Sequence, residues 1–72
     1  MICYKPFWNT LQKSDETTYS LIYRHNVSSA IIQKLRDNKP LNTTTINDLC
    51  RILHCNIQDI ATYIPSDLDQ KL

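Results

Sequence analysis

The feature that most constrains this chain is the stretch from Thr18 to Asp37, in which two runs of apolar residues flank a short polar corner. Within each run the apolar residues lie next to each other or three or four positions apart, so they share one face of a helix. They are Leu21 and Ile22 before the corner and Ile31, Ile32 and Leu35 after it. The pattern predicts two short amphipathic helices that meet at an angle.

The corner is His25-Asn26-Val27-Ser28. The chain contains no glycine, and asparagine is the residue that, after glycine, best tolerates the left-handed conformation that ends a helix. We therefore predict a positive φ at Asn26. Val27 is placed to fill the angle between the helices. The Ser28 hydroxyl can accept a hydrogen bond from the first turn of the second helix, as an N-cap does.

Two helices joined by such a corner have the geometry of a helix-turn-helix, whose second helix enters the major groove of DNA. The outward positions of this helix are Ser28, Ser29, Ala30, Gln33 and Lys34. Glutamine can form two hydrogen bonds with adenine, lysine can donate to guanine or phosphate, and serine can serve either purpose. The same residues also suit an ordinary solvated helix face, so their chemistry alone leaves both interpretations open.

Cap residues and apolar spacing predict an all-α bundle of five helices, at residues 6–13, 18–25, 29–36, 43–53 and 57–62. Pro6 suits a first helical position, and the N-caps are expected at Thr17, Ser28, Asn42 and Asn56. Residues 1–4 are extended in character and either add an edge strand or cover the core. Residues 1–65 form the expected domain, and the polar residues 66–72 form a frayed tail.

The inward stripes of these helices predict a single core. Its expected members are Phe7, Leu11, Leu21, Val27, Ile32, Leu35, Ile46, Leu49, Leu53, Ile57 and Ile60.

Most of the chain, from about Lys5 to Ile64, resembles the Cro/phage-repressor type of helix-turn-helix domain, or XRE family, and most of all its short single-domain bacterial members. The resemblance is carried by Leu11, Leu21, the corner Asn26-Val27-Ser28, Ile32, Leu35, the helix end Leu53-His54-Cys55 and the run Asn56-Ile57-Gln58-Asp59-Ile60. The chain departs from the family pattern at Asn26, where glycine is usual, at Ile22, where a small residue is usual, and at His25, where an apolar residue is usual.

The resemblance implies a repressor-like transcriptional regulator that binds double-stranded DNA in a sequence-specific manner, as a weak homodimer formed mainly on DNA. Residues expected to face the bases are Ser29, Ala30, Gln33 and Lys34. Residues expected to hold the DNA backbone are Ser28, Thr18, Tyr19, Lys39, Thr43 and Thr44. For the two threonines a plain helix start is an equal alternative. The alternative function is a protein-interaction or antitoxin-like module that keeps the fold without strong DNA binding.

Length, charge and the distribution of apolar residues further limit what kind of protein this chain can be. A chain of 72 residues forms one small domain. Its net charge of +1 is low for a DNA-binding protein, although residues 1–40 hold six basic and three acidic side chains and residues 41–72 hold two and four. No apolar run is long enough to span a membrane, and the first residues do not have the layout of a signal peptide. We therefore expect a cytoplasmic protein.

Neither an enzyme nor a cofactor site is expected. The chain has no glycine-rich phosphate loop, no nucleophile motif and little room for a substrate pocket. Cys50, His54 and Cys55 could begin a metal site that Cys3 or His25 would have to complete, but a structural site needs four ligands in a fixed geometry. Cys50 falls on the core stripe of its helix, where a free cysteine acts as a small apolar residue. We therefore predict no metal and no small-molecule substrate.

Overall fold

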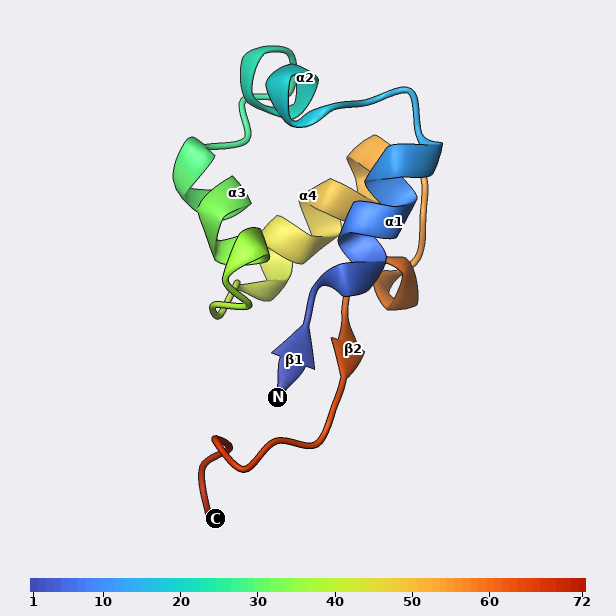
Figure 1. The fold of residues 1–72 in the computed structure, drawn as a ribbon. Helices are drawn as coiled ribbons and strands as arrows, with labels where there is room; N and C mark the ends of the chain where they lie inside the picture. The colour runs from blue at the N-terminus through green and yellow to red at the C-terminus, as the bar shows by residue number, and fades with distance from the viewer.

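A computed structural model describes residues 1–72. It contains four α-helices, one turn of 3-10 helix and a two-stranded antiparallel sheet (Figure 1). In chain order these elements are β1 (Ile2–Cys3), α1 (Lys5–Lys13), α2 (Thr18–Tyr23), α3 (Ser29–Arg36), α4 (Thr43–Leu53), η1 (Ile57–Asp59) and β2 (Thr62–Tyr63).

The helices surround one core. In Figure 1, α4 lies at the centre, with α3 on one side and α1 on the other, while α2 crosses one end and the sheet lies at the other. The short helix η1 packs against both α1 and α4. None of the helices is long and apolar enough to cross a membrane.

Three helices begin at the predicted N-caps. The side chains of Thr17, Ser28 and Asn42 each accept a hydrogen bond from a backbone N–H in the first turn of α2, α3 and α4. These bonds satisfy donors that have no partner inside the helix. The sequence therefore fixes the starting point of each of these helices through a single polar residue.

The helix ends are formed without glycine. Asn26, Asn38 and His54 have φ values of 59°, 54° and 52° and lie beyond α2, α3 and α4. After Asn38 and His54, the N–H of the next residue donates to a carbonyl in the last turn, as in a Schellman motif. The prediction of a positive φ at Asn26 is confirmed, and the other two sites were not predicted.

The prediction of five helices is wrong in its last member. The segment 57–62 forms only the single turn η1 and then the strand β2, because Thr62 and Tyr63 pair with Cys3 and Ile2. The expected extended segment at the N-terminus is therefore one strand of a sheet. Helix α2 also ends at Tyr23 rather than at residue 25, since the chain must turn toward the left-handed Asn26.

The core agrees with the expected stripes at most positions. Nine of the predicted residues are buried, whereas Ile46 is only partly buried and Ile57 is 60% exposed. Ile57 opens the 3-10 turn at the surface, whereas Ile60, directly after the turn, takes the core position with no exposed surface. The buried apolar residues that the sequence did not predict are Tyr4 and Ile52.

The chain after β2 lies beside the N-terminus. The Met1 backbone exchanges hydrogen bonds with Ile64, and the Met1 ammonium group lies 2.8 Å from a carboxylate oxygen of Asp69. Residues 66–72 form no helix or strand and extend away from the bundle (Figure 1). The domain boundary at residue 65 remains a prediction.

Candidate nucleic-acid interface

The corner between α2 and α3 has the predicted geometry. Asn26 turns the chain, and the buried Val27 fills the angle and donates its N–H to the Leu21 carbonyl at 2.9 Å. The N–H of Ile31 then donates to the Ser28 hydroxyl oxygen at 3.2 Å. These contacts fix the direction in which α3 leaves the corner.

Helix α3 has one buried and one exposed face. Ile32 and Leu35 are buried in the core. All five residues predicted to face outward are exposed, namely Ser28, Ser29, Ala30, Gln33 and Lys34. The Gln33 amide donates to a carboxylate oxygen of Asp37 at 3.0 Å, so this hydrogen bond must be exchanged before Gln33 can contact a base.

The last turn of α3 is held by Trp8 of α1. The indole N–H of Trp8 donates to the Leu35 carbonyl at 3.4 Å, and the Arg36 guanidinium lies 5.5 Å from the centre of the indole ring. Phe7, fully buried beside Trp8, packs edge-on against the same ring. The recognition-helix candidate is therefore supported from α1 as well as from the corner.

The residues predicted to contact the DNA backbone lie on three elements around α3. Thr18, which is partly buried, and the exposed Tyr19 open α2, while the exposed Thr43 and Thr44 open α4. Backbone N–H groups in these first turns have no partner within the helix and can bind phosphate.

Lys39 lies in the loop after α3. Its carbonyl accepts a hydrogen bond from the Tyr4 hydroxyl at 2.8 Å, and Asn38 Oδ1 accepts one from the Tyr4 N–H at 2.9 Å. Burial raises the pKa of the Tyr4 hydroxyl, which keeps it protonated and able to donate. The strand end at Tyr4 thus fixes the loop that carries Lys39.

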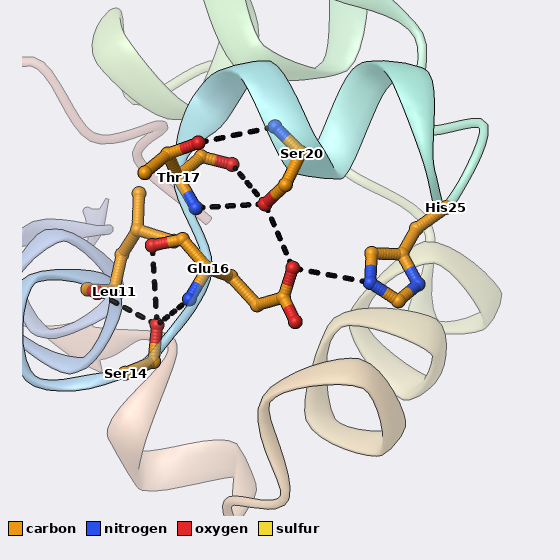
Figure 2. A network of polar contacts seen from close by, with 6 residues as sticks. All are labelled: Leu11, Ser14, Glu16, Thr17, Ser20 and His25. Carbon is orange, nitrogen blue, oxygen red and sulfur yellow. Dashed lines mark hydrogen bonds and ion pairs between the residues drawn. The ribbon is translucent and has the colours of Figure 1, made fainter.

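A polar network below the corner was missed by sequence reasoning (Figure 2). The Ser20 hydroxyl donates to Glu16 Oε1 at 2.7 Å, and His25 Nε2 lies 3.2 Å from the same oxygen. Ser20 and Thr17 also exchange side-chain and backbone hydrogen bonds in a capping box. The bond from Ser20, and then the adjacent His25, lower the pKa of Glu16.

This network accounts for the polar residue at position 25. The family that the chain resembles usually has an apolar residue there, whereas this chain has His25. Figure 2 shows Glu16 extending from the α1–α2 loop toward His25, so the imidazole is paired with a carboxylate instead of with the core. The sequence does contain a signal for this network. Glu16 and Ser20 are four residues apart, and Thr17 and Ser20 are three apart, which are the spacings of a helix-start contact and a capping box.

The cysteines form no metal centre in this structure. No group of three or more histidine, cysteine or acidic side chains gathers as metal ligands would, and all three cysteines are free thiols. Burial, with added contributions from Cys50 and Asp59, raises the pKa of Cys55 to about 11.

Comparison with known proteins identifies this arrangement. A family model described as the Cro/C1-type HTH DNA-binding domain matches residues 7–66. The chain belongs to this family. It is a domain class that binds DNA and carries no enzymatic activity. No curated protein matches the chain.

A solved structure supports the same assignment. The chain is similar to the crystal structure of the transcriptional regulator VanUg, with 26% identity and a TM-score of 0.80. The match covers 90% of this chain and 87% of that one. This Cro/C1-type domain therefore shares nearly its whole fold with a transcriptional regulator.

Proposed function

We propose that this protein is a sequence-specific transcriptional regulator, repressor-like in action, that recognises the major groove of double-stranded DNA with α3. The observation that carries the proposal is that α3 turns a polar, exposed face outward while its apolar face is buried beside a capped corner. Family membership and the similarity to a transcriptional regulator support it further.

In this proposal Ser29, Ala30, Gln33 and Lys34 meet the bases. Gln33 offers the strongest discrimination, because its amide can both donate to and accept from adenine. Ala30 contributes only contact with a thymine methyl group. Ser28, Thr18, Tyr19, Lys39, Thr43 and Thr44 hold phosphates on either side, and such contacts position the protein without specifying sequence.

Two copies are expected to bind one site. A single domain of this kind contacts half of a site, and the second half-site lies about one helical turn, or roughly 34 Å, away. The two α3 helices then enter successive major grooves on one side of the duplex.

The test begins by selecting bound duplexes from a random library and titrating the best site with parent and variant proteins. Gln33→Ala should cost about 1–3 kcal/mol on that site and relax preference at one base pair, whereas Lys39→Ala should weaken all sequences alike. If neither Gln33→Ala nor Lys34→Ala changes affinity or preference, α3 is not the recognition helix. The protein-interaction alternative would then be favoured.

A further inference from the structure

Two of the three cysteines meet at the end of α4. Cys50 lies in the last turn of the helix, and Cys55 follows the left-handed His54 that ends it. Because the chain turns back at His54, the N–H of Cys55 donates to the Cys50 carbonyl at 3.0 Å. This is the longer of the two hydrogen bonds of a Schellman motif, and the side chains at its two ends commonly contact each other. Here both of those side chains are thiols.

The backbone geometry at this helix end fits a disulfide bond. Only the Cα–C–O atoms of Cys50 and the N–Cα bond of Cys55 lie outside the hydrogen bond, so the two Cα atoms are at most about 7 Å apart. Disulfides join residues whose Cα atoms are about 4.4–6.8 Å apart. Both cysteines are packed against the core but only partly buried, so small reagents in solution can reach them.

We propose that Cys50 and Cys55 form a reversible dithiol–disulfide site whose substrates are low-molecular-weight disulfides of the glutathione type. In the reaction the Cys50 thiolate attacks one sulfur of the substrate RSSR, its S–S bond breaks and one thiolate RS⁻ leaves. The Cys55 thiolate then attacks the Cys50 sulfur of this mixed disulfide, and the second RS⁻ leaves. The protein dithiol is oxidised, the substrate is reduced, and the two thiol protons pass through solvent to give two RSH.

The surroundings of the two thiols set this order of attack. Burial, and then the neighbouring Cys50 and Asp59, raise the pKa of Cys55 to about 11, so little of its thiolate is present at neutral pH. Cys50 is therefore the first nucleophile. Cys55 has only to attack a sulfur that is already held beside it, and this proximity offsets its small thiolate fraction.

The new bond would join the last turn of α4 to the segment that leads into η1. Ile52 and Leu53 of that turn are buried in the core. Closing this loop removes conformational freedom from the unfolded chain, so the oxidised protein should melt about 5–10 °C above the reduced protein. The site shares no residue with the proposed recognition face, and it does not rest on the proposed function.

Peptide mapping after incubation with glutathione disulfide, in about tenfold excess over the protein thiols, tests the site. Free thiols are then blocked with iodoacetamide, and the protein is digested with trypsin. Arg51 lies between the two cysteines, so trypsin separates them, and the internal disulfide would join peptides 37–51 and 52–71. We expect mass spectrometry to find this cross-linked pair, which a reducing agent should separate.

Three serine variants make the comparison, and circular dichroism checks that each of them folds. Cys3→Ser is the matched control, because Cys3 lies in β1 and pairs with Thr62. It should form the same cross-link. Cys55→Ser should instead accumulate glutathione on Cys50, and Cys50→Ser should react at Cys55 at least about tenfold more slowly. Cys55→Ser should also lose the rise in thermal midpoint that oxidation gives the parent.

Two results would overturn the proposal outright. One is a parent that carries glutathione on separate peptides without the cross-linked pair, and the other is a parent that stays fully reduced. The two thiols would then serve only as apolar contacts at the helix end. Equal reaction rates of Cys50→Ser and Cys55→Ser would overturn the order of attack. An oxidised parent that melts below the reduced one would contradict the fit of the bond to the end of α4.

Discussion

At the scale of single residues, two asparagines and one histidine adopt the left-handed conformation that glycine usually supplies at helix ends. Asn26, Asn38 and His54 all adopt the left-handed conformation, but they differ in what else they do. Asn38 Oδ1 also accepts the N–H of the buried Tyr4, whereas Asn26 only turns the chain at the corner. The two asparagines should therefore respond differently to the same substitution.

Replacing Asn26 by Gly should leave the free energy of unfolding unchanged or slightly higher, because glycine adopts a positive φ without steric cost. Asn38→Gly should instead destabilise the protein by about 1 kcal/mol, since the buried N–H of Tyr4 loses its acceptor. Urea unfolding of both variants makes the comparison. Asn26→Val should cost about 1–2 kcal/mol, and a valine variant as stable as the parent would contradict the strain argument.

Glu16 makes the stability of the corner depend on pH. Its pKa in the folded protein lies below the ordinary value of 4.5, first because Ser20 donates to it and then because His25 is near. A carboxylate with a lowered folded pKa contributes stability that is present above the unfolded pKa and is lost as pH falls through the folded value.

Glu16→Gln should therefore lower the thermal midpoint at neutral pH, and its difference from the parent should shrink as pH falls from about 5 to about 3. Thermal unfolding followed by circular dichroism across this range measures the effect. Asp15→Asn changes a neighbouring exposed carboxylate and serves as the control. A constant difference between Glu16→Gln and parent at every pH would show that the carboxylate charge contributes nothing.

At the scale of elements, the sequence predicts a helix well where an N-cap residue is followed by apolar residues at helical spacing. Ser28 and Asn42 mark the starts of α3 and α4, and the exposed face of α3 was predicted residue by residue. Segment 57–62 was misassigned because its helical spacing is local, whereas its pairing with Ile2 and Cys3 depends on residues about sixty positions away. Tyr4 was missed for the same reason, since its hydroxyl bonds to the distant Lys39.

Element α4 offers a direct test of this distinction. Leu49 is only 1% exposed at its centre, so Leu49→Ala should destabilise the protein by about 2–5 kcal/mol through lost burial and the cavity left behind. Ile57→Ala, at an exposed position of η1, should change stability by no more than about 0.5 kcal/mol. Chemical unfolding compares the two. If both substitutions changed the free energy of unfolding equally, either Leu49 would not be buried in the core or Ile57 would not be exposed.

At the scale of the whole molecule, the low net charge of +1 limits how strongly this domain can hold DNA without sequence recognition. Lys34 is exposed on α3, and Lys39 is exposed in the loop that follows it. Asp37 lies between them in sequence and accepts the hydrogen bond from Gln33. Under the proposed function, a domain with so few lysines on this face would depend on its base contacts for discrimination and on a second copy for affinity.

The salt dependence of DNA binding measures how much of the affinity comes from charged phosphate contacts. Lys39 is the one lysine proposed to hold a phosphate, so two copies make about two charged phosphate contacts, and the logarithm of the binding constant should fall with the logarithm of salt concentration with a slope of about −2. Affinity should then drop roughly tenfold between about 50 and about 200 mM salt. Lys39→Ala in both copies should flatten the slope by about two, one for each lost phosphate contact, whereas Gln33→Ala should lower affinity and leave the slope unchanged. Fluorescence anisotropy on the selected duplex gives both quantities. A parent slope near zero would mean that Lys39 does not face a phosphate. An altered slope for Gln33→Ala would mean that its substitution shifts the whole domain on the duplex.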